Sequence, residues 1–359
     1  MPKNVLILFG GKSSEYEISL KSAAFVLRET PSELYQIYSV GITKSGEWFL
    51  FSGDSDSVEN GEWIAQPQNL KRAVLSPDSK THGLVVLNDD HTFETIHIDI
   101  AFGVLHGKFG EDGTLQGLFE IAGIPYVGPN VVSSANCMDK VFSRIIFDSA
   151  GLPQTKWMFF TKNEFEFSSF SDIINRVNAS LSYPVFVKPA NAGSSVGISK
   201  VKNEHELKAA FEFAFIHDHK ILVEEGVDAR EIEVAVLGNH DPIVSPCGEI
   251  VSCNEFYDYD AKYVIDSELQ IPALLPSDIC REVERIAKQS YRALNCEGLS
   301  RVDFLVRKTD NKVFLNEINT IPGFTKISMY PKLFAQKGIP AGKLLQTLFE
   351  LAVLRFEEV

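Results

Sequence analysis

Short runs of apolar, β-branched residues alternate with segments of helical period along the whole chain, and this alternation predicts an α/β fold. The opening unit is the clearest example. Residues 5–9 form a predicted buried strand that ends at Gly10 and Gly11, residues 18–28 a helix, and residues 37–42 a second strand. Because open α/β sheets bind ligands beyond the carboxyl ends of their strands, this Gly-rich turn is expected beside a ligand site.

The rest of the chain continues the pattern. Residues 52–95 are polar with short apolar pieces, and we expect a surface excursion or hairpin region within the first domain. Domain boundaries are expected near residues 130 and 224. The predicted domains are 1–130, 131–224 and 225–359. The further predicted strands are 185–189, 221–224, 231–237, 300–307 and 313–318, and the further predicted helices are 114–122, 134–150, 204–215, 278–294 and 343–356.

Charge and composition exclude several classes of protein. The chain has 48 Asp and Glu against 34 Lys and Arg, a formal net charge of −14, whereas nucleic-acid binders need concentrated positive charge. A negative net charge also does not favour electrostatic attachment to an anionic membrane. No apolar run approaches the ~18 residues of a membrane-spanning helix, and the short apolar stretch at the N-terminus is not a signal peptide. We expect a cytoplasmic protein whose 5 scattered cysteines are small buried hydrophobes.

The common nucleotide-binding motifs are absent, but one loop suits phosphate. The first Gly of a P-loop ending at Gly11-Lys12-Ser13 would fall at Leu6, and Gly10-Gly11 lacks the spacing of a dinucleotide fold. A second glycine-rich segment, residues 191–197, follows a predicted strand that carries Lys188. Its glycines, its hydroxyls and this lysine suit a phosphate lid, and a plain hairpin turn is the alternative.

Two predicted strands carry polar side chains at two-residue spacing. Arg301 and Asp303 lie on one strand, and Glu317 and Asn319 lie on the other. Since side chains alternate across a strand, each pair is expected on one face. Two carboxylates and an amide oxygen are hard ligands suited to Mg²⁺, which completes its shell with phosphate oxygens. A salt-bridged solvent face is the alternative, but the apolar neighbours mark both strands as core elements.

Two further segments accompany these strands. Residues 319–325 form a predicted turn in which Gly323 is free to expose its N–H. Residues 255–263 interleave four aromatic side chains with charged ones, in a segment without clean periodicity. An ordered loop and a buried aromatic cluster are both compatible with this composition.

The order of these motifs resembles that of the D-alanine–D-alanine ligase family of the ATP-grasp superfamily, across essentially the whole chain. The resemblance implies a three-domain ATP-grasp architecture with an N-terminal Rossmann-like domain built on an open parallel sheet. It implies an enzyme that uses ATP to make an acyl phosphate from one D-alanine, which the amine of a second then attacks. The dipeptide would serve peptidoglycan synthesis. The matching segments are 10–15, 106–113, 138–140, 188–197, 224–231, 256–263, 301 with 303, and 316–325.

The resemblance also assigns nucleotide and metal contacts. Two Mg²⁺ ions, replaceable by Mn²⁺, would lie between the phosphates. Their expected ligands are Asp303, Glu317 and Asn319. The ATP contacts that the resemblance implies are Lys140, Lys188 and Lys262 at the phosphates, Ser194 and Ser195 in the lid, Glu224, Glu225 and Val227 at the adenine, and Glu231 at the ribose.

The same resemblance assigns the chemistry of the two D-alanines. Glu15 would bind the ammonium of the first one, with Ser194 and Tyr263 as its partners. Arg301 and the Gly323 N–H would stabilise the tetrahedral intermediate. The implied substrate-binding residues are Glu15, His106 with Glu111 in its loop, and Ser328 with Lys262 for the second carboxylate.

Two other functions are weighed against this one. Ligases of the vancomycin-resistance type, which make D-Ala–D-Lac or D-Ala–D-Ser, usually change the aromatic segment and its last tyrosine, so Tyr263 favours the dipeptide. A non-catalytic nucleotide-binding module is disfavoured because the metal ligands and Arg301 are all present. Asn191 stands where many relatives carry Arg, which is expected to affect lid packing. The family also implies a homodimer.

Overall fold

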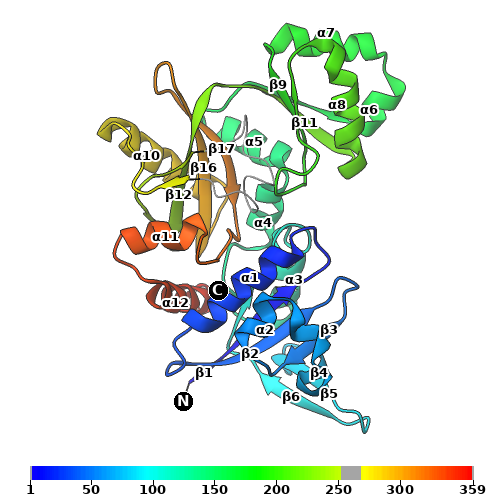
Figure 1. Cartoon of the computed structure of the whole chain (residues 1–359), viewed down its shortest axis with the longest axis vertical. Coiled ribbons are helices and arrows are strands. Elements are labelled where there is room, and N and C mark those ends of the chain that lie inside the picture. Colours follow the sequence, from blue (N-terminus) through cyan, green and yellow to red (C-terminus); the bar gives the residue numbers. More distant parts are fainter. Residues whose placement is uncertain (1, 252–267, 358–359) are drawn as a thin grey trace.

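The computed structural model describes residues 2–251 and 268–357. Among these residues there are three β-sheets, of seven, four and six strands, with helices packed on them. In Figure 1 the first sheet lies at the bottom, the third in the middle and the second at the upper right. The predicted α/β architecture is confirmed.

The first sheet has the strand order β6-β5-β4-β3-β2-β1-β7 and is mixed. Only β2-β1-β7 is parallel, which corrects the expectation of a parallel sheet. The strands from β2 to β6 each pair antiparallel with the next strand in the sequence. Short loops join them, except that residues 52–69 between β3 and β4 carry α2 and two 3₁₀ turns. The strands are β1 (Lys3–Gly10), β2 (Tyr35–Ile42), β3 (Trp48–Phe51), β4 (Leu70–Leu75), β5 (Gly83–Leu87), β6 (Phe93–His97) and β7 (Ile100–Gly103).

Helices cover the faces of this sheet. The segment 52–95, predicted as a surface excursion or hairpin region, supplies the hairpins of β4 to β6 and also part of the core. Trp63 is fully buried there, with its ring 5.1 Å from that of Phe9 and 6.2 Å from that of Phe51. The helices of this part are α1 (Tyr16–Glu29), α2 (Ser55–Glu59) and α3 (Thr114–Ala122), with 3₁₀ turns at Glu62–Ala65 and Pro67–Asn69.

One predicted helix is in fact two. Residues 134–150 were expected to be continuous, but α4 (Val131–Met138) ends before Asp139 and α5 (Lys140–Ser149) begins after it. Asp139 has an extended backbone, and its carboxylate accepts hydrogen bonds from the N–H groups of Val141 and Phe142. Asp is a favoured N-cap residue because its carboxylate accepts hydrogen bonds from the free N–H groups of a helix's first turn, and Asp139 therefore starts the second helix. The break places Lys140 at the first position of α5.

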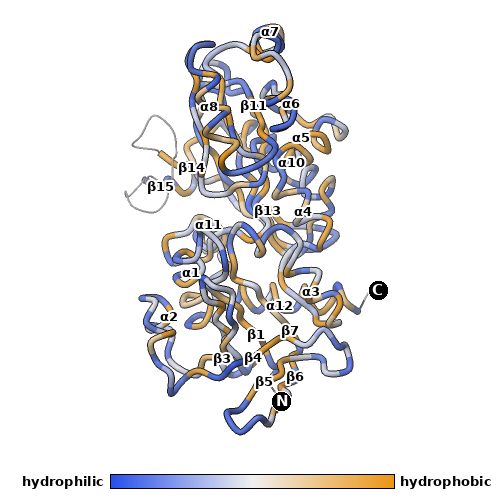
Figure 2. Tube along the Cα trace, turned by 90° about the vertical axis from the view of Figure 1, so that its right-hand side faces the viewer, coloured by the Kyte–Doolittle hydropathy of each residue, from blue (hydrophilic) through white to orange (hydrophobic). Residues whose placement is uncertain are grey.

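The second sheet is antiparallel, in the order β10-β9-β11-β8. Its buried face packs against α8, where Leu207 and Phe211 are fully buried. The elements are β8 (Trp157–Thr161), α6 (Lys162–Phe167), α7 (Phe170–Ser180), β9 (Val185–Pro189), β10 (Ser199–Val201), α8 (Glu204–His217) and β11 (Lys220–Glu225). Figure 2 shows α6, α7 and α8 at the end of the molecule opposite to the first sheet.

The third sheet has the order β15-β14-β12-β16-β17, with β13 beside β12. The C-terminal helix α12 packs on the first sheet. The ring of its Phe349 lies 4.9 Å from that of Tyr35 in β2 and 6.5 Å from that of Phe102 in β7. The strands are β12 (Ala229–Leu237), β13 (Ile243–Val244), β14 (Gly248–Val251), β15 (Glu268–Gln270), β16 (Leu299–Arg307) and β17 (Val313–Asn319). The helices are α10 (Ser277–Ala293), α11 (Met329–Gln336) and α12 (Ala341–Glu357).

Two composition-based predictions concern cysteines and membranes. Cys137, Cys247 and Cys296 are buried and Cys280 is half-buried, all as free thiols, while Cys253 lies outside the described residues. Within the described ranges, no helix combines the length and the apolar character needed to cross a membrane.

Candidate active site

A cavity of about 1610 Å³ lies between the loops that follow β1 and β7 and the strands of the other two sheets. It brings together every predicted site residue of the described ranges, from segments spread over the whole sequence. Lys262 and Tyr263, with the rest of the aromatic segment after Val251, lie outside the described residues. The predicted residues that line the cavity are Glu15, His106, Glu111, Lys140, Lys188, Ser194, Ser195, Glu224, Glu225, Val227, Glu231, Arg301, Asp303, Glu317, Asn319, Gly323 and Ser328.

The predicted metal ligands meet on the paired strands β16 and β17. Asp303 lies opposite Glu317 in the register, and the Asn319 Nδ2 donates to Asp303 Oδ2 at 2.9 Å. Among the described residues, no group of three or more His, Cys, Asp or Glu side chains is arranged to hold a metal ion. Two carboxylates with one amide are nevertheless a fitting set for Mg²⁺, because that ion takes few protein ligands and shares substrate phosphates. The donor set therefore fits the ion.

Arg301 is held in place beside these ligands. Its Nε and Nη2 donate to the two carboxylate oxygens of Asp303 at 2.7 Å each, and its Nε lies 3.1 Å from Glu233 Oε2. Burial alone would lower the pKa of Arg301, but Asp303 and Glu233 outweigh it and raise this pKa well above its ordinary value. Sequence reasoning missed Glu233. The signal was available, since Glu233 follows Glu231 at two-residue spacing on a strand that lines the cavity.

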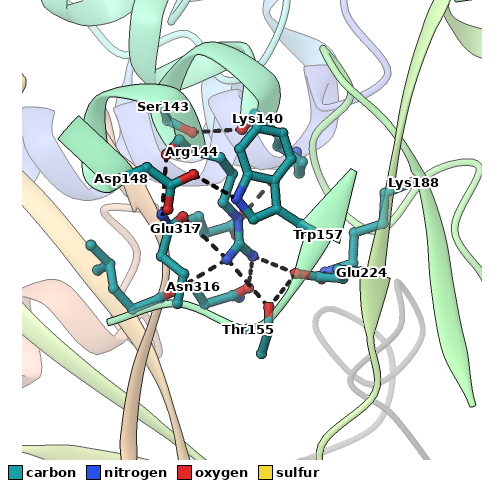
Figure 3. Close-up of polar contacts among 12 residues, drawn as sticks. Lys140, Ser143, Arg144, Asp148, Thr155, Trp157, Lys188, Glu224, Asn316 and Glu317 are labelled. Atoms are coloured by element: carbon teal, nitrogen blue, oxygen red, sulfur yellow. Dashed lines mark hydrogen bonds and ion pairs between the residues drawn. The ribbon is translucent and has the colours of Figure 1, made fainter. Parts of the chain in front are cut away.

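A buried ionic cluster lies at the wall of the cavity that β9 and β11 form (Figure 3). Glu224, on β11, is 2% exposed and forms ion pairs with Lys188 of β9 and Arg144 of α5. Thr155 Oγ1 donates to the same carboxylate at 3.1 Å. Burial would raise the pKa of Glu224, but the charges of Lys188 and Arg144 outweigh it and lower the pKa to about 2. Arg144 was not predicted, because its partner lies 80 residues away in the sequence.

Replacing Arg144 by Met should destabilise the protein strongly. The substitution leaves the Glu224 carboxylate buried with a single cation, and breaking a buried pair in this way costs about 3–5 kcal/mol. The double variant Arg144→Met/Lys188→Met leaves the carboxylate with neither of its cations and should lose more stability than Arg144→Met alone. The measurement is the free energy of unfolding in urea.

The control for this pair is Arg285→Met. Arg285 forms an exposed ion pair with Glu282 on α10, at 2.6 Å, so its loss should change the free energy of unfolding much less. Equal effects of the two single substitutions would contradict the importance of the buried cluster.

The predicted lid, residues 191–197, joins β9 to β10 as a hairpin and also reaches the first domain. Ser194 Oγ donates to the carboxylate of Glu15, and both side chains are buried. Ser194 and Ser195 have φ of 50° and 60°, a left-handed conformation that non-glycine residues seldom adopt. A Cβ at Gly193 would lie 2.9 Å from Glu15 Oε2, so a larger residue there would displace the Glu15 carboxylate. The loop is therefore a hairpin connection whose tip contacts Glu15 at the cavity, and its role as a phosphate lid stays a prediction.

Two lid contacts concern residues singled out from the sequence. Lys140 Nζ donates to the Ala192 carbonyl at 2.8 Å and lies 3.9 Å from Glu317 Oε2. This lysine thus lies between the loop 191–197 and strand β17. Asn191 donates through its backbone N–H and its Nδ2 to Asp218 Oδ2, at 2.8 and 3.0 Å. An Asn at this position therefore fastens the base of the lid to the segment after α8.

The turn after β17 lies against the loop after β7. Glu111 accepts hydrogen bonds from the N–H groups of Gly107 at 2.7 Å and Ile321 at 3.1 Å. Burial, with the nearby Glu15 charge, raises the pKa of Glu111 to about 8 despite these two bonds. Farther along the turn, the Thr325 N–H donates to Ser328 Oγ at 3.0 Å. These contacts hold the segment around Gly323 at the wall of the cavity.

Comparison with known proteins supports one family. The profile described as "D-ala D-ala ligase N-terminus" matches residues 4–129, and "D-ala D-ala ligase C-terminus" matches residues 146–350. The chain is 45% identical to a D-alanine–D-alanine ligase from Acetivibrio thermocellus, over 99% of this chain and 97% of the relative. It is 47% identical to the enzyme of that name from Clostridium acetobutylicum, over 99% of each.

Solved structures give the same picture. The chain resembles the VanG D-Ala:D-Ser ligase from Enterococcus faecalis with a TM-score of 0.89 and 38% identity, over 98% of this chain and 100% of the other. It resembles the D-alanine–D-alanine ligase from Coxiella burnetii with a TM-score of 0.85 and 31% identity, over 99% and 95%.

Proposed function

The chain belongs to the D-alanine–D-alanine ligase family and has its ATP-grasp fold, and from this premise we propose how its own residues carry out the ligation. It is an ATP-dependent enzyme that joins two D-alanines to D-alanyl-D-alanine, a peptidoglycan precursor, through a D-alanyl phosphate. The observation that best supports the residue roles is the single cavity lined by all the described candidates.

On the nucleotide side, we propose that the protein binds ATP between the second and third sheets. Lys140 and Lys188 would contact the phosphates, and Glu224, Glu225, Val227 and Glu231 would bind adenine and ribose. Asp303, Glu317 and Asn319 would hold two Mg²⁺ ions, or Mn²⁺ in their place. Bound metal would neutralise charge on the transferring phosphoryl group. The hard oxygen donors on one face of β16 and β17 support this assignment.

On the substrate side, Glu15 would hold the ammonium of the first D-alanine, which leaves its carboxylate free to take the phosphoryl group. Tyr263 and Lys262 would complete the acceptor site with Ser328. The contact of Ser194 with Glu15 supports a lid that closes when this site is filled. Closure has a chemical purpose, because an acyl phosphate exposed to water would hydrolyse.

In the second step, the amine of the acceptor attacks the acyl carbon and phosphate leaves. We propose that Arg301 and the Gly323 N–H stabilise the negative oxygen of the tetrahedral intermediate. Arg301 suits this role because two carboxylates fix its planar guanidinium before substrate binds. Such preorganised donors need not reorient as the charge develops.

A D-Ala–D-Ser ligase is the second candidate, because VanG is a close structural neighbour. The curated relatives at 45–48% identity are D-alanine–D-alanine ligases and favour the dipeptide. We further propose a cytoplasmic homodimer with a role in cell shape, and the domain limits 1–130, 131–224 and 225–359. The family supports these points.

Phosphate release from ATP tests the activity. With Mg²⁺ present, D-alanine should stimulate release many-fold, whereas L-alanine and D-lactate, each added alone, should not. The stereochemical control matters because ATP hydrolysis by a contaminant would not depend on D-alanine. Phosphate release that D-alanine leaves unchanged would favour the non-catalytic nucleotide-binding module instead.

A further inference from the structure

The turn that carries Gly323 is fastened to the N-terminal part of the chain on both sides of that glycine. Before it, Ile321 is held by its N–H to Glu111 and by its carbonyl, which lies 3.0 Å from His106 Nδ1. Directly after it, the Phe324 N–H donates to Ser22 Oγ at 3.2 Å. The Gly323 peptide therefore lies between two anchored backbone positions.

Ser22 joins these contacts into one chain of hydrogen bonds. It lies on α1, is fully buried, and its Oγ is 3.0 Å from His106 Nε2. A serine hydroxyl has one proton to donate and lone pairs to accept with. Because a carbonyl oxygen only accepts, His106 carries a proton on Nδ1 and donates it to the Ile321 carbonyl. In the neutral ring Nε2 then accepts the Ser22 proton, while the Phe324 N–H donates to a lone pair of Ser22 Oγ.

This arrangement requires a neutral imidazole, and the surroundings of His106 favour one. Burial lowers the pKa of His106, and the charge of Arg301 lowers it further. The charge of Glu15 and the hydrogen bond to Ile321 raise this pKa but do not outweigh burial, so it lies below its ordinary value. Both ring nitrogens of His106 are therefore engaged in holding the turn.

We propose that Ser22 is a positioning residue for the ligation: through His106 and the Phe324 N–H, it aims the Gly323 N–H at the developing oxyanion. The proposal rests on the proposed function, in which that N–H stabilises the tetrahedral intermediate. Within the described residues, Ile18, Lys21 and Phe25 of α1 line the cavity and Ser22 does not. Ser22 acts from behind the turn, without touching substrate.

The effect expected from Ser22→Ala follows from this geometry. Losing an oxyanion donor altogether costs about 10²- to 10³-fold in kcat, and a misplacement of about 1 Å costs up to ~100-fold. Ser22→Ala removes the link and leaves the Gly323 N–H in place, so kcat should fall by roughly 10- to 100-fold. The KM for ATP should stay within about twofold of the wild-type value, because the proposed ATP contacts lie on the second and third sheets and on α5, away from Ser22.

The experiment measures kcat, the KM for ATP and the unfolding temperature of the full-length enzyme making D-alanyl-D-alanine. Ser290→Ala is the matched control: Ser290 is also a fully buried helix serine, and its Oγ bonds the Ala287 carbonyl within α10. Both variants lose one buried hydroxyl, and Ser22→Ala should lose more stability because it also leaves the Phe324 N–H without its acceptor. The control should retain wild-type kcat, since a merely structural loss does not affect turnover of the folded enzyme.

The outcomes separate this inference from the proposed function. If the wild-type enzyme makes no dipeptide, the function itself fails. If it does and Ser22→Ala keeps wild-type kcat, or loses only ATP affinity, the positioning role is overturned. Should Ser22→Ala not fold, Ser22→Cys takes its place, because a thiol of similar size is a weak donor. Ser22→Cys should have reduced kcat at unchanged KM for ATP, and wild-type kcat would overturn the proposal.

Discussion

Glu317→Gln should lower turnover by several orders of magnitude while the protein stays folded. The substitution keeps the size of the side chain but removes a charge that we place between two metal ions, on the face it shares with Asp303. A neutral amide is a weaker ligand for Mg²⁺ and leaves the charge of the transferring phosphoryl group less well neutralised. The measurement is kcat at saturating Mg²⁺, with circular dichroism to confirm folding.

Glu94→Gln is the control for this variant. Glu94 is a strand residue that also faces a lysine, Lys71 at 3.1 Å, but this pair is exposed on the first sheet. Its loss should leave kcat unchanged. Near-normal turnover of Glu317→Gln would remove Glu317 from the metal site and, with it, much of the mechanism.

Arg301→Lys should lower kcat by roughly 10²- to 10³-fold, the range found when an oxyanion donor is lost. Lysine keeps the charge but not the planar fork that reaches both oxygens of Asp303 and also Glu233. The KM for ATP should change little, because the interaction strengthens only as the tetrahedral intermediate forms. Steady-state kinetics with ATP and D-alanine varied separately distinguish the two effects.

Arg307→Lys, on the same strand, gives the matching control. Arg307 also makes a two-pronged contact, to Asp310 at 2.8 and 2.6 Å, but at the protein surface. Its replacement should leave both kinetic constants unchanged. If Arg301→Lys raises only the KM for ATP and leaves kcat unchanged, Arg301 binds the nucleotide and does not stabilise the tetrahedral intermediate.

The sequence predicted best those parts of the molecule that local patterns determine. Two-residue spacing placed Arg301 and Asp303 on one face of their strand and Glu317 and Asn319 on one face of theirs, and the pairing of β16 with β17 brings Asp303 opposite Glu317. The glycine-rich loop after Lys188 was predicted to be a phosphate lid or a hairpin turn, and it is a hairpin connection whose tip contacts Glu15. In both cases, neighbours in the sequence already contain the physical signal.

The parts that could not be predicted depend on contacts between distant residues. Arg144 and Ser22 look like ordinary helix positions, and only the fold brings them to Glu224 and to Phe324. The break at Asp139 was missed because the helical periodicity of the apolar residues continues through it. The hydrogen bonds by which Asp139 caps α5 interrupt the helix there all the same. The mixed first sheet was missed because strand patterns do not specify the direction of pairing.

The central claim is that this enzyme joins two D-alanines. The most direct test incubates it with ATP, Mg²⁺ and an equal mixture of D-alanine, D-serine and D-lactate, and identifies the products by mass. We expect D-alanyl-D-alanine as the main product, formed with one ADP and one phosphate each. A main product containing D-serine or D-lactate, or no condensed product while ATP still binds, would contradict the account.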